Sequence, residues 1–239
     1  AASDVYKRQV RTADMVETKE GHANFVTVYD KKVQETLRKK LLEILPEAVF
    51  VGEEDDVHAS IKKGFAFIVD PIDGTTNFIK DYHVSAISAG LTKDGEKYIG
   101  VVYNPYLDEM FTAERGKGAF LNGRPIHVSR NPLSEGIVLF GTAPYYEELS
   151  KKSFQMAYAY FKKALDVRRS GSAAIDLCSI AAGRAELYFE LRLSPWDFAA
   201  GALIVEEAGG VVTTVEGGAV TLGQKCSVLA TNGRCGRLE

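Results

Sequence analysis

Residues 70–78 read Asp70-Pro71-Ile72-Asp73-Gly74-Thr75-Thr76-Asn77-Phe78, and the apolar run at 64–69 before them predicts a buried strand. Two carboxylates are therefore expected where a core strand ends. Pro71 stiffens the backbone between them, and Gly74 permits a turn that a side chain would disfavour. An acidic pair followed by glycine and threonine indicates a metal ion on one side and a phosphate group on the other.

Thr75 and Thr76 are expected to cap a short helical turn after this motif, because threonine oxygens accept hydrogen bonds at helix starts. The free backbone N–H groups of such a turn would hold an anion. A polar turn without chemistry remains the alternative interpretation, and an isolated D-x-x-D-G pattern would favour it.

A second acidic stretch follows a second short strand. Residues 48–51 predict the strand, and after Gly52 the chain reads Glu53-Glu54-Asp55-Asp56. Such a run is usually a solvated loop. However, two neighbouring strand ends that both carry carboxylates would converge, and this is how a sheet can build a site for several metal ions.

The remaining pattern predicts helices around antiparallel strands. A helix is expected over 28–45, with Thr27 and Asp30 at the T-x-x-D spacing of an N-cap pair. Strands at 85–91, 98–103 and 109–112, and the Asn-Gly turn at 122–123, predict an antiparallel meander rather than regular strand–helix alternation. A helix at 146–163 carries several aromatic residues, which we interpret as core.

Two later segments combine helix starts with polar residues. Ser170 or Ser172 is expected to cap a helix that ends near residue 183, and a strand at 185–189 is expected to end at Glu190. Farther on, Ser194 and Asp197 have the spacing of a capping pair, with proline at the first helical position. Taken locally, Asp197 needs no chemical role.

Composition bounds the class of protein. The 239 residues are 46% hydrophobic and 26% charged, which is typical of a globular chain, and we expect one domain over 1–239, with 1–9 a non-native remnant. The net charge of −3 and the lack of a Lys/Arg block argue against nucleic acid as the main partner. No apolar run approaches the roughly 18–20 residues that span a bilayer.

Other motifs exclude several enzyme classes. The three cysteines show no CxxC spacing and indicate a reducing cytoplasm, and the four histidines lack the spacing of a zinc site. Phosphate-binding G-x-x-x-x-G-K-[ST], dinucleotide-binding G-x-G-x-x-G and nucleophile-elbow G-x-S-x-G motifs are all absent from the sequence.

Together, four motifs resemble the inositol monophosphatase family of magnesium-dependent, lithium-sensitive phosphatases. In chain order they are Gly52-Glu53-Glu54, the stretch from Asp70 to Thr75, Gly171-Ser172-Ala173 and Trp196-Asp197-Phe198-Ala199-Ala200-Gly201. The resemblance extends from about residue 16 to residue 232. It implies an α+β fold, a layered α/β/α/β/α sandwich with mixed, largely antiparallel sheets, and it implies a homodimer that hydrolyses phosphate monoesters.

By the same resemblance, carboxylates from three segments would bind two or three Mg²⁺ ions. A first ion would be held by Glu53, Asp70 and the backbone carbonyl of Ile72. A second would be held by Asp70, Asp73 and Asp197, and Glu53 would contribute to a third, weaker site. These oxygen ligands suit Mg²⁺, which retains waters and binds through a few carboxylates and substrate phosphate.

The resemblance also implies roles in catalysis and substrate binding. Asp30 would pair with Thr75, whose hydroxyl would help to orient the attacking water, and the competing interpretation of Asp30 is plain helix capping. The backbone N–H groups of Gly74 and Thr75 would hold the phosphate. The residues implied at the alcohol part of the ester are Gly171, Ser172, Ala173 and Glu190.

The substrate is open at this point. The leading expectation is inositol monophosphate, a small phosphorylated polyol. Fructose 1,6-bisphosphate and 3′-phosphoadenosine 5′-phosphate are alternatives, because Arg192 stands where the family commonly has glycine and would bind a second phosphate if it pointed inward. As a surface arginine it would not. A non-catalytic member that contacts other proteins is the remaining alternative.

Overall fold

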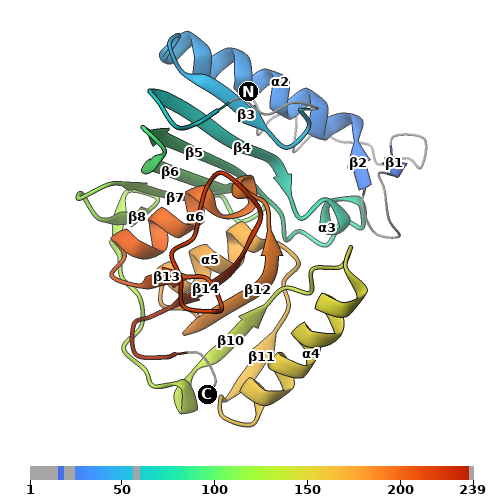
Figure 1. Ribbon diagram of the computed structural model, residues 1–239, viewed down its shortest axis with the longest axis vertical. Coiled ribbons are helices and arrows are strands. Elements are labelled where there is room, and N and C mark those ends of the chain that lie inside the picture. Colours follow the sequence, from blue (N-terminus) through green and yellow to red (C-terminus); the bar gives the residue numbers. More distant parts are fainter. Residues whose placement is uncertain (1–15, 19–24, 56–59, 237–239) are drawn as a thin grey trace.

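The computed structural model describes residues 16–18, 25–55 and 60–236. Residues 1–9, which we expect to be a non-native remnant, and Asp56 of the acidic run both lie outside these ranges. Five layers alternate through the molecule: a helix, a sheet, a pair of helices, a second sheet and an outer helix (Figure 1). This arrangement confirms the predicted α/β/α/β/α sandwich.

The first sheet is the predicted meander. Its order is β3-β4-β5-β6-β7-β8-β9, with β3 parallel to β4 and every other pair antiparallel. The strands are β3 Val49–Gly52, β4 Phe65–Asp73, β5 Ala86–Lys93, β6 Glu96–Asn104, β7 Glu109–Glu114, β8 Ala119–Leu121 and β9 Arg124–Ile126. The predicted Asn-Gly turn joins the last two.

Strand β4 is longer than its apolar run suggested. It continues through Pro71 to Asp73, and its register against β5 shifts between Asp70 and Asp73. This irregularity accommodates the proline, which cannot donate to the ladder. The motif is therefore the irregular last part of a core strand, not a loop that follows it.

Helix α2 (Val28–Ile44) forms over the predicted residues and covers the outer face of this sheet (Figure 1). Thr27 and Asp30 form the expected capping box. Before it, β1 (Val16–Thr18) pairs antiparallel with β2 (Phe25–Thr27).

The second sheet is mixed, with the order β11-β10-β12-β14-β13. Strand β10 is parallel to β11 and β12, whereas β14 is antiparallel to β12 and β13. The strands are β10 Ile137–Phe140, β11 Asp166–Arg168, β12 Leu187–Leu193, β13 Val211–Thr213 and β14 Cys226–Thr231. Glu190 does not end β12 as predicted; the strand continues to Leu193 through an irregular register against β14.

Helices α5 (Ala173–Ala181) and α6 (Pro195–Glu207) fill the space between the two sheets. Two glycines permit this close packing. A Cβ atom at Gly100 of β6 would lie 2.6 Å from the carbonyl oxygen of Ala200, and one at Gly201 would lie 2.8 Å from Leu177 of α5. Gly100 therefore lets α6 sit directly on the sheet, and Gly201 of the Trp-Asp motif lets α6 pack closely against α5.

Helix α4 (Glu147–Phe161) covers the outer face of the second sheet, next to the short 3₁₀ turn at Leu133–Glu135. Its aromatic residues are only partly core, which corrects our interpretation. Tyr160 is fully buried, but Phe154, Tyr158 and Phe161 are 57%, 62% and 49% exposed. These three side chains recur at helical spacing and form an exposed aromatic face on the described part of the chain.

Among the described residues, no helix combines the length and the apolar character that crossing a membrane requires.

Candidate active site

One cavity of about 380 Å³ gathers almost every residue that the motifs predicted. It opens where β3 and β4 end, beside the start of α3 (Thr75–Ile79), of α5 and of α6. Of the predicted residues, those that line it are Glu53, Asp70, Ile72, Asp73, Gly74, Thr75, Gly171, Ser172, Ala173, Glu190 and Asp197. Segments far apart in the sequence thus contribute to a single site.

The two acidic strand ends converge as expected. Because β3 and β4 are parallel, with Gly52 beside Val69, their carboxyl ends place Glu53 next to Asp70. Asp70 is buried, and its Oδ1 accepts a hydrogen bond of 2.9 Å from the backbone N–H of Ile72. This bond holds the Asp70 carboxylate against the backbone of the same motif.

Asp73 and Asp197 are each held by a helix start. The Oδ2 atom of Asp73 accepts hydrogen bonds from the Ser172 hydroxyl and from the Ala174 backbone N–H, which donates over 2.8 Å. Oδ2 of Asp197 accepts from the backbone N–H of Ser194 at 2.7 Å, in the predicted capping pair. Asp197 therefore both takes part in capping α6 and lines the cavity.

Thr75 does not cap α3, contrary to prediction. Gly74 takes the N-cap position with φ of +90°, a left-handed conformation that glycine adopts readily, and no side chain caps the helix. Thr75 is the first helical residue, and its Oγ1 turns back to lie 3.1 Å from the carbonyl oxygen of Ile72 and 3.3 Å from Oδ1 of Asp30. Its hydroxyl can donate to either oxygen.

Asp30 is the predicted residue that does not line the cavity. It is fully buried behind Thr75, where Oδ2 accepts from the backbone N–H of Thr27 at 2.7 Å and from its hydroxyl at 2.5 Å. The other carboxylate oxygen faces Thr75. Asp30 thus caps α2 and contacts Thr75 at the same time.

Burial raises the pKa values of these carboxylates. Burial, followed by the charges of Glu53, Asp73 and Asp197, raises the pKa of Asp70 well above its usual value. Burial raises the pKa of Asp73 to about 6, against the opposing hydrogen bonds from Ser172 and Ala174. Within the described ranges, no Lys or Arg forms an ion pair with Asp70, Asp73 or Asp197. Cations would relieve this accumulation of negative charge.

The donor set fits Mg²⁺ better than a metal that needs a closed protein cage. Across the described residues, no three His, Cys, Asp or Glu side chains lie close enough together to form a ligand set on their own. The three carboxylates expected to hold a second ion, Asp70, Asp73 and Asp197, therefore do not form a ready-made ligand set in this structure. Mg²⁺ requires no such set, because it keeps several waters and binds through one or two carboxylates and substrate phosphate. Carboxylates and the Ile72 carbonyl are the hard oxygen ligands that it prefers.

The opposite wall of the cavity is anchored by Glu190. Its Oε1 accepts from the backbone N–H of Ala143 at 2.9 Å, and its Oε2 accepts from the Tyr188 hydroxyl at 2.8 Å. Close approach to Gly141 leaves no room for a side chain there, since a Cβ atom would lie 1.9 Å from Oε2. The carboxylate is therefore held in one orientation toward the cavity.

Sequence reasoning missed several residues of the site. Asn77 donates to the carbonyl oxygens of Val84 and Ser170, at 2.7 and 2.8 Å, and so ties the first motif to the segment before α5. The motif itself contains Asn77 and could have indicated it. No local pattern indicated the other lining residues, which include Tyr145, Arg169, Asp176 and Lys225.

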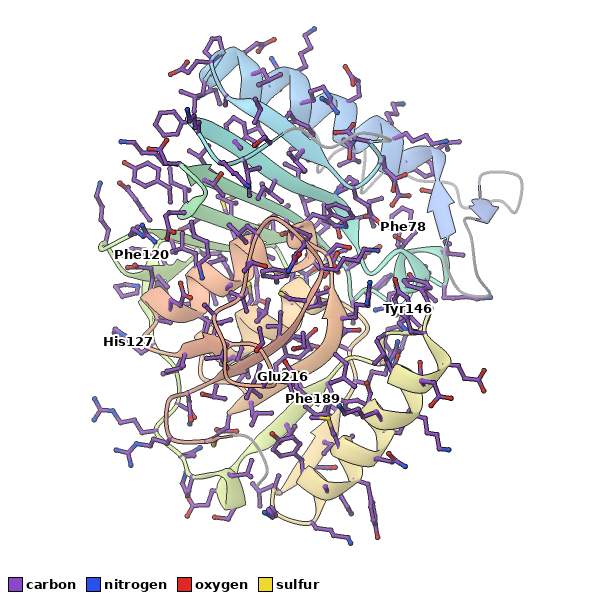
Figure 2. All side chains as sticks on the ribbon, in the orientation of Figure 1. Phe78, Phe120, His127, Tyr146, Phe189 and Glu216 are labelled. Atoms are coloured by element: carbon purple, nitrogen blue, oxygen red, sulfur yellow. The ribbon has the colours of Figure 1, made fainter. Side chains whose placement is uncertain are left out.

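Arg192 lies at the cavity, and its guanidinium carbon is 4.7 Å from the centre of the Tyr146 ring. Figure 2 shows Tyr146 where the segment before α4 approaches α3, on the same side of the molecule as Phe78. The side chain of Arg192 is exposed, yet it lines the cavity that the motifs form.

Comparison with known proteins agrees with this geometry. The sequence model of the inositol monophosphatase family matches residues 1–237. An inositol-1-monophosphatase of Rhizobium meliloti is 40% identical over 83% of this chain and 75% of the relative, and the Nus factor SuhB of Vibrio cholerae is 38% identical over 88% and 80%. The solved structure of Thermotoga maritima IMPase aligns with a TM-score of 0.88 and 32% identity over 98% of this chain and 88% of that one. The chain therefore belongs to the inositol monophosphatase family.

Proposed function

We propose that this protein is a Mg²⁺-dependent phosphatase that hydrolyses a phosphate monoester of a small polyol or sugar, with inositol monophosphate as the leading substrate. The observation that carries the proposal is the convergence of Glu53, Asp70, Asp73 and Asp197 on one cavity that also contains the start of α3. Family membership and the inositol-1-monophosphatase relatives support the same class of reaction.

The acidic edge would hold two or three Mg²⁺ ions, through the four carboxylates and the backbone carbonyl of Ile72. When bound, these ions would lower the pKa of a water and neutralise charge on the phosphoryl oxygens. The protein's part is to fix its own ligands. Asp70 is held by Ile72, Asp73 by Ser172 and Ala174, and Asp197 by Ser194.

Thr75 and Asp30 would orient the attacking water. Buried Asp30 keeps an acceptor oxygen 3.3 Å from the Thr75 hydroxyl, which faces the cavity from the first turn of α3. The backbone N–H groups of Gly74 and Thr75 would bind the phosphate, because the first N–H groups of a helix have no partner within it.

The alcohol part of the ester would lie against the wall formed by Gly171, Ser172, Ala173 and Glu190. Each oxygen of Glu190 already accepts one hydrogen bond and retains capacity for another, so the carboxylate would accept from substrate hydroxyl groups in a fixed orientation. The family resemblance further suggests a homodimer and inhibition by lithium.

The direct test is phosphate release from inositol monophosphate with Mg²⁺ and then with excess EDTA. We expect release that requires the metal. Activity that persists undiminished in EDTA would contradict the proposal.

A second candidate is a non-catalytic role in contacts with other proteins. It is favoured by the exposed aromatic face of α4 and by the name Nus factor SuhB among the relatives. This candidate would be favoured if the protein binds Mg²⁺ but shows no phosphatase activity toward any substrate.

A further inference from the structure

The loop between β10 and α4 forms part of the cavity wall and contains a residue in an unusual backbone conformation. Ala143 is buried and has a φ of +43°, in the left-handed region that residues with a side chain rarely adopt. Its backbone is held on both sides, because its N–H donates to Glu190 and its carbonyl oxygen accepts from the N–H of Tyr146 at 3.0 Å. Backbone strain of this kind persists where surrounding contacts fix the chain, and it is frequent at functional sites.

The bond from Tyr146 to Ala143 closes a β-turn whose two central residues are Pro144 and Tyr145. Proline suits the first of these positions because its φ is fixed near the value that the turn requires. The Ser150 hydroxyl, in the first turn of α4, lies 3.2 Å from the Ala143 carbonyl oxygen and can donate to it. The turn therefore holds the backbone of Tyr145 at the edge of the cavity.

The side chain of Tyr145 lines the cavity. It is also 51% exposed, so the ring lies where the cavity opens to solvent. Partial burial and then the charges of nearby carboxylates raise its pKa to about 12, and in order of effect these carboxylates are Glu53, Asp197, Glu190 and Asp70. The phenol therefore keeps its proton at neutral pH and remains a hydrogen-bond donor beside the site.

The protein does not use this donor itself. Within the part of the chain that the structure describes, the Tyr145 hydroxyl has no hydrogen-bond partner. By contrast, the Ser172 hydroxyl donates to Asp73, and the Tyr188 hydroxyl donates to Glu190. Tyr145 thus offers a free donor near Glu190, which can still accept, and a substrate hydroxyl both donates and accepts.

We propose that Tyr145 is a substrate-binding residue that selects cyclic polyols: its ring lies against the C–H face of the bound ring, and its hydroxyl donates to a substrate hydroxyl that donates in turn to Glu190. This inference rests on the proposed function and assigns a specificity determinant within that site. A saturated polyol ring has C–H groups on its faces and hydroxyls at its edge. Tyrosine, with an apolar ring and a polar tip, matches both parts. A short acyclic alcohol lacks the rigid face.

The test compares inositol 1-phosphate, whose alcohol is a ring, with glycerol 2-phosphate, whose alcohol is acyclic. Tyr145→Ala should raise KM for inositol 1-phosphate about tenfold or more and KM for glycerol 2-phosphate less than about threefold. Tyr145→Phe keeps the ring and removes the hydroxyl, so KM for inositol 1-phosphate should rise about threefold, as the loss of one neutral hydrogen bond predicts. For both variants kcat should stay within about twofold of wild type, because the contact binds ground state and transition state alike.

Two other tyrosines provide matched controls. Tyr146→Phe controls for loss of a hydroxyl, because Tyr146 is adjacent to Tyr145 but does not line the cavity. Tyr158→Ala controls for loss of a ring, since Tyr158 is 62% exposed on α4. Both controls should leave KM for both substrates within about twofold of wild type. Melting temperatures verify that all variants fold.

Each outcome separates the inference from the proposed function. In Tyr145→Ala, unchanged KM values, equal increases for the two substrates or a loss confined to kcat would overturn the role of Tyr145 and leave the phosphatase intact. An effect of Tyr146→Phe as large as that of Tyr145→Phe would also overturn it. If wild-type protein hydrolyses neither substrate, the proposed function fails, and calorimetric titration with inositol 1-phosphate in Mg²⁺ decides the inference. Wild-type protein should then bind about fivefold more tightly than Tyr145→Ala, and equal affinities or no binding would refute the contact.

Discussion

The backbone N–H of Ala174 donates a hydrogen bond of 2.8 Å to the Asp73 carboxylate, and so joins two residues that are 101 positions apart. Asp73 ends β4 in the first sheet, whereas Ala174 lies in the first turn of the helix α5 that packs between the sheets. The same carboxylate oxygen accepts from the Ser172 hydroxyl. The geometry of a proposed metal ligand thus depends on how the two halves of the molecule are packed.

Asp73→Asn should abolish turnover while the protein remains folded. Asparagine has nearly the same shape and keeps an oxygen that can accept from Ala174, but it removes the charge that the proposed metal site needs. We expect kcat to fall about 10³-fold or more, in line with losses of preorganised electrostatic groups. Phosphate release measures kcat, and circular dichroism verifies the fold. Hydrolysis at the wild-type rate would refute the role of Asp73.

Ser172→Ala should reduce stability and activity together. Ser172 caps α5 by accepting from the backbone N–H of Ile175 at 3.3 Å, and its hydroxyl donates to Asp73. Loss of an N-cap costs about 1 kcal/mol, and the lost bond to a carboxylate adds a similar amount. Urea denaturation should show a loss of roughly 1–3 kcal/mol. Ser172→Thr retains the hydroxyl and should be near wild type, whereas an equal loss in both variants would contradict this assignment.

The stability of the metal-free protein should fall as pH rises from about 4 to about 6. Burial raises the pKa of Asp30 to about 6 from 3.8, so the folded state binds more protons than the unfolded state in this window. Asp30 therefore makes the free energy of unfolding larger below pH 4 than above pH 6, by about 3 kcal/mol at most.

Asp30→Asn isolates this contribution, because the amide does not titrate. The decline in unfolding free energy between pH 4 and pH 6, measured in EDTA, should become shallower in the variant. Glu35→Gln, which removes an exposed carboxylate from the same helix, is the control. An unchanged decline in Asp30→Asn would show that Asp30 does not titrate as its buried position implies.

Gly141→Ala should impair substrate binding by displacing Glu190. The added methyl group would lie 1.9 Å from Oε2 of Glu190, so the carboxylate must move. We expect KM to rise about tenfold, because the oriented hydrogen bonds to substrate hydroxyls would be lost. Gly218→Ala is a matched control, since its methyl group would meet only Thr214, at an ordinary contact distance of 3.4 Å. Equal KM values in both variants would contradict the role of Glu190.

Mg²⁺ should raise the melting temperature of the protein. Ions that bind only the folded state stabilise it by about 2.7 kcal/mol at a hundredfold excess over Kd, which corresponds to roughly 5–10 °C for a domain of this size. Differential scanning fluorimetry with Mg²⁺ and with EDTA measures the shift. A shift of the same size in Asp70→Asn would show that the metal binds elsewhere.

Much of the fold and site follows from local patterns in the sequence. The apolar run before Asp70 predicted the core strand, and the turn at Asn122-Gly123 predicted the hairpin of β8 and β9. Parallel pairing of β3 with β4 then brings Glu53 to Asp70, as the acidic strand ends indicated.

The errors share a physical cause, because tertiary contacts override local preference. Thr75 was expected to cap α3, but Gly74 adopts the N-cap conformation and the Thr75 hydroxyl turns toward Asp30. Strand β12 continues past Glu190 because β14 pairs with its irregular end. The surroundings of Lys225 and Tyr145 depend on how distant segments meet at the cavity, and no short pattern encodes this.

The most direct test of the central claim is phosphate release from inositol monophosphate by wild-type protein and by Asp73→Asn, each with Mg²⁺ and with EDTA. We predict release only by wild-type protein with Mg²⁺. Equal release in all four reactions would contradict a metal-dependent phosphatase site at Asp73.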